Sequence, residues 1–309
     1  MKTNKTLRIL GIVAIVLCLF VALGISVFAA ENTNVAKVGN TEYATIDEAI
    51  ANWTNGTTLT LLADVTLSDT IQLSSTEYHI LDLGTYTMTA ASKKDAIQIV
   101  NNGRSSASYA LDIKADANNP GGITASGKAV VKTTGKSGVK DRPIIRFYNG
   151  VLTGSYVVSH SGSNGTNCPQ FWFYGGEFNG TVYANRALFQ FYGGTFNGSL
   201  QISVDSSAYA LVAGGRFKKL SNMMGSALNS GKFTIGSAKG TYNRSIYVDA
   251  EGYYVITSEL ITEVSAKYPA VKKETYNSNN YFYYSAANTY GMFYEVASMA
   301  GTGDNVTIY

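Results

Sequence analysis

A ten-residue phrase occurs twice in the middle of the chain, and its two copies start 18 residues apart. Residues 171–180 read FWFYGGEFNG, and residues 189–198 read FQFYGGTFNG. Looser copies are IIRFYNGVLTG, from Ile144, and AYALVAGGRFKK, from Ala208. The paired small residues of the four copies begin at Asn149, Gly175, Gly193 and Gly214, at intervals of 26, 18 and 21 residues. A period of about twenty residues predicts that one short structural unit stacks on the next.

In each copy, apolar side chains occupy alternate positions on both sides of a turn. Alternation with a period of two predicts strands that bury one face. Before the turn, the inward pairs are Ile145/Phe147, Phe171/Phe173, Phe189/Phe191 and Ala210/Val212. After the turn, the pairs are Tyr156/Val158, Val182/Ala184 and Leu200/Ile202. Two or three strands in so short a repeat favour an all-β fold in which the units wind as a parallel β-helix.

In a parallel β-helix, equivalent residues of successive units stack into columns about 4.8 Å apart. We therefore expect Phe178, Phe196 and Phe217 to form an aromatic ladder inside the protein. The corner between the strands requires a residue that adopts positive φ without strain, which glycine does. The first glycines of the pairs, Gly175, Gly193 and Gly214, are expected to fill that role.

Short apolar strands separated by polar turns also fill the first half of the chain. They lie at 59–67, 71–73, 79–89, 96–100, 109–114 and 129–133. Ahead of them, Thr45 and Glu48 stand at the capping-box spacing that begins a helix. Ile46, Ala49, Ile50 and Trp53 then share one face of that helix. We expect this N-terminal helix to cover the open edge of the strands, which would otherwise accept further strands.

The first 29 residues have the pattern of an export signal. A stretch with three basic residues leads into an uncharged apolar run, and small residues favour cleavage after Ala29. The alternative is an uncleaved membrane anchor, because the run from Ile9 to Phe28 is 20 residues long and a hydrocarbon core needs about 20. Both interpretations place the remaining chain outside the cytoplasm, and membrane contact is expected only through this segment.

The charge balance of the chain changes when this leader is set aside. Of 24 Lys and Arg residues 21 remain, against 21 Asp and Glu. A neutral chain offers no basic surface for nucleic acid. Cys168 is then the one cysteine, so no internal disulfide can form. Because it lies in the polar stretch GSNGTNCPQ, we expect its thiol to be exposed.

The end of the chain departs from the repeat. Residues 258–289 have the composition of a linker or irregular segment. Residues 290–309 then align without gaps with residues 43–62, with Tyr290 on Tyr43 and Glu295 on Glu48. We interpret 290–309 as the start of a second cap-helix and strand unit or as a C-terminal cap.

Four features make the chain resemble a known group. They are VAKVGNTEYATIDEAIANWTNGTTLTLLADVTLSDTIQL (35–73), HILDLGTYTMT (79–89), the GGxF repeats and YVDAEGYYVIT (247–257). These resemble the right-handed β-helix, pectate-lyase-like repeat modules of secreted and wall-attached surface proteins of Firmicutes. The resemblance implies a right-handed parallel β-helix over residues 30–257. It also implies a non-catalytic, extracellular bacterial surface module that serves adhesion or spacing. We expect no cofactor, and we expect host or cell-wall glycans or surface proteins as partners.

The same fold family includes polysaccharide lyases and hydrolases, which makes catalysis the alternative. Asp82 and Asp112 are expected to point outward from their strands, with Gln98 on a strand between them. If the strands of Asp82, Gln98 and Asp112 belong to three consecutive units, the two aspartates stand in one column two spacings apart. That is about 9–10 Å, at the upper end of the carboxylate separation of inverting glycosidases. We favour the plainer interpretation, two solvated aspartates. His79 and His160 lack a catalytic or metal-ligand pattern, so surface or turn positions are expected for both.

A binding surface has better candidates. Tyr148, Tyr174 and Tyr192 follow the inward phenylalanines and are expected to face outward in one column, with Trp172 beside them and Tyr183 further along. Exposed amphipathic rings at regular spacing can stack on sugars or anchor a protein partner. The alternative is a ladder that packs on itself and only stiffens the surface.

Overall fold

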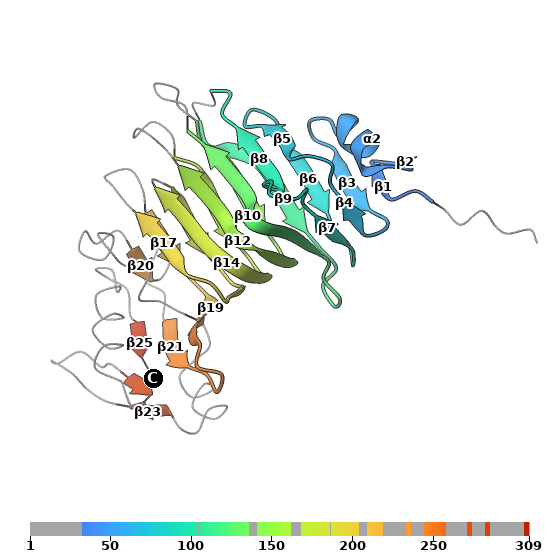
Figure 1. Ribbon diagram of the computed structural model, residues 1–309. Helices are drawn as coiled ribbons and strands as arrows, with labels where there is room; N and C mark the ends of the chain where they lie inside the picture. Colours follow the sequence, from blue (N-terminus) through green and yellow to red (C-terminus); the bar gives the residue numbers. More distant parts are fainter. Residues whose placement is uncertain are drawn as a thin grey trace, which may run out of the picture. The chain divides into compact units, whose positions relative to one another are not determined.

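The computed structural model describes most of the chain between residues 33 and 218 and shorter segments beyond it (Figure 1). The described ranges are 33–103, 106–135, 141–161, 168–185, 187–203, 209–218, 233–235, 244–257, 271–273, 282–284 and 306–308. The predicted leader, residues 1–29, and residues 290–305 therefore lie outside the described residues. No helix among the described residues is both long enough and apolar enough to span a membrane.

One short helix and many short strands make up the described chain. The first elements are β1 (Ala36–Val38), β2 (Thr41–Tyr43), α2 (Ile46–Ala51), β3 (Thr58–Leu61), β4 (Val65–Thr66), β5 (Ile71–Ser74), β6 (His79–Asp82), β7 (Thr87–Thr89), β8 (Ile97–Val100), β9 (Ser108–Lys114), β10 (Gly122–Thr134), β11 (Pro143–Phe147) and β12 (Val151–Ser161). The remaining strands are β13 (Gln170–Phe173), β14 (Glu177–Asn185), β15 (Leu188–Phe191), β16 (Thr195–Phe196), β17 (Leu200–Ser203), β18 (Tyr209–Val212), β19 (Gly215–Phe217), β20 (Phe233–Ile235), β21 (Arg244–Val248), β22 (Tyr254–Thr257), β23 (Val271–Lys273), β24 (Phe282–Tyr284) and β25 (Val306–Ile308). The prediction of an all-β fold is confirmed.

The strands form two large sheets. Sheet A has the order β2-β1-β3-β6-β9-β11-β13-β15-β18-β20 and runs parallel from β3 onward. Sheet B has the order β25-β21-β22-β19-β16-β14-β12-β10-β7-β4, with β17 paired to β14, and β5 joined through β8 to β10. The arrows of β8, β10, β12 and β14 lie side by side in Figure 1. From β3 to β19, each repeat unit thus gives one strand to sheet A and then one or two to sheet B.

Two ladders of phenylalanine rings fill the space inside the repeat units. Phe178 stacks on Phe196 at a centroid distance of 4.7 Å, and Phe196 stacks on Phe217 at 4.8 Å. A second ladder consists of Phe147, Phe173 and Phe191, with distances of 4.7 and 5.1 Å. All of these side chains are buried, and such ring pairs contribute about 0.5–1.5 kcal/mol each beyond their burial. The predicted internal ladder is confirmed.

The two glycines of each pair have different roles from those the sequence indicated. The second glycine carries the positive φ, which is 106° at Gly176, 96° at Gly194 and 129° at Gly215. The first glycine instead lets the chain pass close to the preceding unit. A Cβ atom on Gly193 would lie 2.4 Å from the carbonyl oxygen of Tyr174. The prediction that the first glycine adopts positive φ was wrong, because that position is restricted by contact and not by torsion.

The alternation of buried and exposed residues breaks in β12. Tyr156 is 39% exposed, whereas Val157 and Val158 are both buried. The register with β14 shifts between Thr153 and Tyr156 and again between Tyr156 and Val158. These irregularities turn Tyr156 outward, so its predicted inward position was wrong.

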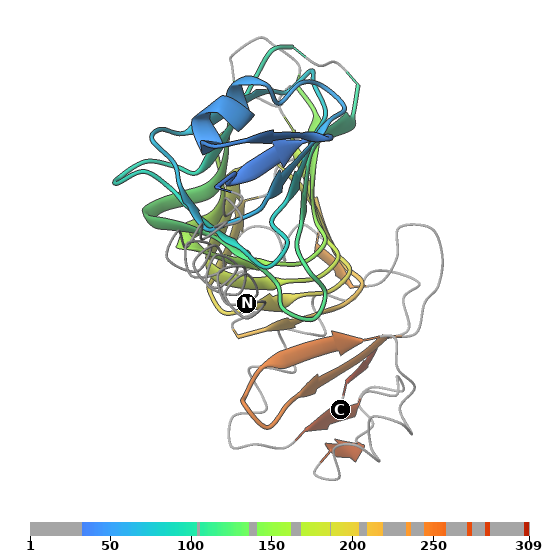
Figure 2. The ribbon, with the colours of Figure 1, turned by 90° about the vertical axis from the view of Figure 1, so that its right-hand side faces the viewer.

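The predicted N-terminal helix is present but shares its role with two strands. Thr45 caps α2, because its Oγ1 accepts a hydrogen bond of 3.2 Å from the backbone N of Glu48. Ile46, Ala49 and Trp53 are buried, and the helix packs beside β1 and β2 (Figure 2). The edge of sheet A is extended by β1, which pairs antiparallel with β3. The sequence pattern missed β1 and β2, since each has only three residues.

Removal of the helix cap provides a modest test of this arrangement. Thr45→Ala is expected to lower the free energy of unfolding by about 1 kcal/mol, because the Glu48 amide loses its acceptor. Urea unfolding followed by circular dichroism measures the change. Thr41→Ala, on the exposed strand β2, is the control and should cost less. Equal costs for the two variants would contradict the capping role of Thr45.

Beyond the last repeat unit, sheet B changes direction. β22 pairs antiparallel with β19, and β21 pairs antiparallel with β22. Arg216 bonds to Asp249 and to Glu251, and the hydroxyl of Tyr253 donates to Oδ1 of Asn197 at 2.6 Å. β25, from the predicted second unit, pairs with β21, and β23 pairs with β24 within the predicted linker.

Candidate ligand-binding face

Strand register sets which side chains meet on the outward-facing side of sheet A. Inward residues such as Leu111, Phe147 and Phe173 alternate with outward ones. One outward column contains Asp112, Arg146, Trp172 and Gln190, which are paired in register across β9, β11, β13 and β15. The three tyrosines of the repeated phrase directly follow β11, β13 and β15 and form a second column. We call these two columns the aromatic face.

The tyrosines of the aromatic face stack flat on one another. Tyr148 and Tyr174 are 5.0 Å apart between ring centroids with planes at 10°, and Tyr174 and Tyr192 are 5.0 Å apart at 9°. Tyr174 is 38% and Tyr192 is 42% exposed. Because the ring faces cover one another, the stack presents ring edges and hydroxyl groups to solvent. Tyr183 is not part of it, since it pairs with Gln201 in sheet B and contacts Tyr156.

Trp172 lies beside the tyrosine stack and is held by polar and aromatic neighbours. Its Nε1 donates to Oε1 of Gln170 at 3.2 Å. Tyr109, which is 41% exposed, meets it edge to face at 6.1 Å. The hydroxyl of Tyr192 donates to Oε1 of Gln190. The contacts with Gln170 and Tyr109 fix the orientation of the indole of Trp172, which remains partly exposed.

A buried ion pair forms one end of the aromatic face. Asp112 is 1% exposed and accepts hydrogen bonds of 2.6 Å from both Nε and Nη2 of Arg146. Tyr78 donates to Oδ2 of Asp112 at 2.7 Å, and the guanidinium lies 3.7 Å from the ring centroid of Tyr109. Arg146 and Tyr78 were not predicted from the sequence, because the cluster joins distant segments. Arg146 is 34 residues from Asp112, and Tyr78 is 68 residues from Arg146.

The ionisation of this cluster is fixed at neutral pH. Burial and the hydrogen bond to Asp112 raise the pKa of Tyr78 to about 12. Burial alone would lower the pKa of Arg146, but the hydrogen bonds to Asp112 and the attraction of its charge together outweigh burial and raise this pKa. Tyr78 is therefore a neutral hydroxyl and Arg146 a permanent cation, so neither group can act as a base.

The two aspartates do not stand in the column that the sequence indicated. β6 and β9 are adjacent in sheet A, and Asp82 pairs in register with Lys114 while Ile80 pairs with Asp112. Gln98 lies on β8 in sheet B and not between them. The predicted register was wrong because the units that begin at β3 and β6 each have a third strand, β5 and β8, which the spacing alone cannot assign to a sheet. Asp82 instead accepts a hydrogen bond of 3.0 Å from the backbone N of Gly84.

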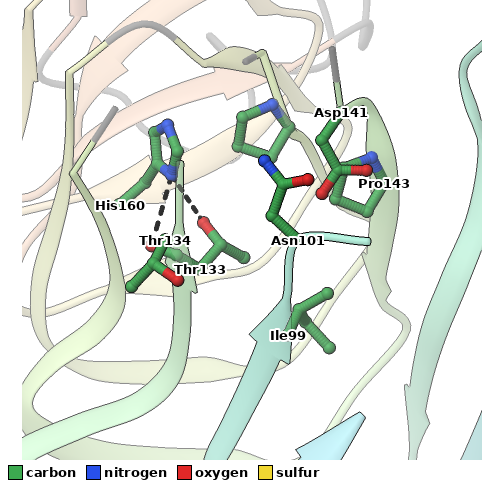
Figure 3. Close-up of a pocket in the computed structure, with 8 residues that line it drawn as sticks. Ile99, Asn101, Thr133, Thr134, Asp141, Pro143 and His160 are labelled. Atoms are coloured by element: carbon green, nitrogen blue, oxygen red, sulfur yellow. Dashed lines mark hydrogen bonds between the residues drawn. The ribbon is translucent and has the colours of Figure 1, made fainter. Parts of the chain in front are cut away.

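Both histidines and Cys168 are buried, which corrects the predicted exposed positions. His79 packs edge to face on Trp53 at 5.0 Å. His160 places Nδ1 2.7 Å from the hydroxyl of Thr133 (Figure 3), and burial lowers the pKa of His160 to about 4. A small pocket beside it is lined by Ile99, Asn101, Thr133, Thr134, Asp141, Pro143, His160 and Pro169. The two histidines point inward because they occupy buried positions of the alternating strands β6 and β12.

No grouping of three side chains suited to a metal ion occurs within the described ranges. No protein-family model, curated protein or solved structure matches the chain. Any functional inference therefore depends on the side chains themselves, and the aromatic face brings the exposed rings of Tyr174 and Tyr192 together in one ordered stack.

Proposed function

We propose that residues 30–257 form a right-handed parallel β-helix module of a secreted or cell-surface bacterial protein, and that its aromatic face binds glycans in adhesion. The parallel pairing of successive units and the stacked columns between them support the β-helix. The apolar leader at residues 1–29 supports export.

The observation that carries this proposal is the exposed tyrosine stack beside Trp172. Tyrosine and tryptophan combine an apolar ring with a polar group, which suits surfaces that bind partly apolar, partly hydroxylated ligands. The rings of Tyr148, Tyr174 and Tyr192, each of which carries a hydroxyl, recur at a centroid spacing of 5.0 Å. A repeating ligand such as an extended glycan meets equivalent groups at each step. The ring edges contact its C–H groups, and the hydroxyls exchange hydrogen bonds with its own.

A β-helix polysaccharide lyase or hydrolase is the alternative function. It would use Asp82 and Asp112 as its carboxylates. This alternative has less support, because the carboxylate of Asp112 already accepts hydrogen bonds from Arg146 and Tyr78. A surface module that binds no ligand and serves only as a structural spacer is the third alternative.

The test is a glycan-array screen of the purified chain. Trp172→Ala and Tyr174→Ala are each expected to weaken binding roughly tenfold or more, as aromatic residues at the centre of binding sites do. Tyr156→Ala is the matched control, since Tyr156 is an equally exposed tyrosine in sheet B. Absence of binding by the folded chain, or an equal loss in Tyr156→Ala, would contradict the proposed site.

A further inference from the structure

The charges of the aromatic face and its surroundings balance. Four charged side chains stand at outward positions of β6, β9 and β11, namely Asp82, Asp112, Lys114 and Arg146. The next strands, β13 and β15, carry only neutral residues at outward positions, which are Gln170, Trp172, Leu188 and Gln190. Within these described strands, two negative charges therefore offset two positive ones.

The pairing of Arg146 with Asp112 is close enough to cancel most of the field of each. Nε and Nη2 of the guanidinium both point at the carboxylate, and Nη2 also donates to the hydroxyl of Tyr78 at 3.2 Å. Among the described residues, none accepts a hydrogen bond from Nη1 of Arg146, and the side chain is 15% exposed. Nη1 thus offers N–H donors to a ligand, while the ion pair carries no net charge.

Lys114 adds little to the attraction for anions. Its Nζ lies 5.3 Å from the ring centroid of Tyr148, and Asp82 faces it in register on the next strand. A carboxylate or sulfate on a ligand would lose hydration at this face without gaining a net opposite charge. A hydroxyl group loses less and can accept from Nη1 or exchange hydrogen bonds with the tyrosine hydroxyls.

On the premise that the aromatic face binds glycans, we infer that it selects neutral saccharides over saccharides that bear uronate or sulfate groups. Asp112 is the specificity-determining residue, because its carboxylate cancels the charge of Arg146. The same carboxylate orients the guanidinium, so that its remaining donors are presented at a fixed position.

The experiment compares neutral and acidic hexasaccharides by calorimetry on the full chain. Cellohexaose and mannohexaose are the neutral probes, and hexagalacturonate and a heparin hexasaccharide are the acidic ones. The unmodified chain is expected to bind a neutral probe at least about tenfold more tightly than either acidic probe. Its affinity should change less than about twofold between about 50 and about 300 mM salt.

Asp112→Asn tests the residue directly. Asparagine keeps the shape and one acceptor but leaves the charge of Arg146 unbalanced, so affinity for the acidic probes should rise about tenfold and become sensitive to salt. Asp249→Asn is the matched control. It removes one of the two acidic partners of Arg216, which lies at the end of sheet B, and makes the same change in net charge away from the face. It should leave the preference unchanged.

The outcomes separate this inference from the proposed function. Tighter binding of an acidic probe by the unmodified chain, steep salt dependence, or an equal shift in Asp249→Asn would overturn the inference while leaving glycan binding intact. Absence of binding to these probes and to the whole array would overturn the proposed function itself. The comparison of neutral with acidic probes on the unmodified chain requires no variant. It therefore tests the preference for neutral saccharides even if Asp112→Asn does not fold.

Discussion

Replacing Gly198 by alanine is expected to lower the free energy of unfolding by at least about 3 kcal/mol, at or above the upper end for overpacked positions. A Cβ atom on Gly198 would lie 2.0 Å from the carbonyl oxygen of Gly180 and 2.4 Å from its carbonyl carbon. Both contacts are with backbone, which cannot rotate away as a side chain can. Gly180 stands in the same relation to Gly154, at 2.2 Å from its carbonyl oxygen. The repeat units would have to separate to admit the methyl group.

Urea unfolding of Gly198→Ala measures this cost, and Gly127→Asn is its control. Gly127 has a φ of +72° and nothing within 4 Å of its Cβ position. Asparagine tolerates this torsion better than most residues, so the control should cost less than about 1 kcal/mol. If Gly198→Ala lowers the free energy of unfolding no more than Gly127→Asn does, the repeat units do not approach each other as closely at Gly198 as the structure indicates.

Most of the fold could be predicted from the repeated phrase, but the separate role of each of its glycines could not. Period-two alternation was enough to predict the strands and the ladder of Phe178, Phe196 and Phe217. It did not distinguish Gly193, which avoids a contact, from Gly194, which adopts positive φ. Both requirements are met by glycine, so the sequence alone cannot tell which glycine meets which requirement. The positions of the neighbouring repeat units in the structure show the difference.

The aromatic face was predicted in part, for a related reason. The tyrosine column follows from one repeated position, so the pattern was visible within a single phrase. The ion pair at one end of the face depends on register between units of unequal length, with Asp112 and Arg146 separated by 34 residues. Arg146 does occupy the same position of the phrase as Trp172 and Gln190. Aligning YALDIK with the phrase would have placed Asp112 in that column.

Buried polar residues were the least predictable feature of the chain. His79 and His160 alternate with apolar neighbours on β6 and β12, so their inward positions follow from the strand period. We predicted surface positions for both histidines instead, because unpaired polar groups are costly to bury. The cost is reduced by Glu77, whose Oε2 lies 3.2 Å from Nε2 of His79, and by Thr133 beside His160.

Burial of His160 is expected to make the protein lose stability in mild acid. The imidazole is 1% exposed, and burial lowers its pKa to about 4 in the folded protein, against about 6.5 in an unfolded chain. Below pH about 6.5 the unfolded chain binds a proton that the folded protein excludes. Stability is therefore complete above this pH and falls by up to about 1.4 kcal/mol per pH unit until pH about 4. Burial also lowers the pKa of His79, against the opposing effect of Glu77, which adds to the loss.

His160→Asn separates this effect from other causes of acid sensitivity. The asparagine amide can donate to the carbonyl of Thr133, as Nδ1 of His160 does at 3.3 Å, but it does not titrate. Urea unfolding between pH about 7 and about 4.5 should show that the variant loses about 2 to 3 kcal/mol less than the unmodified chain over this range. A parallel loss in both proteins, or an NMR titration of His160 with a pKa near its ordinary value, would mean that the imidazole is hydrated in the folded state. His79, whose pKa burial also lowers, contributes to the slope that remains in the variant.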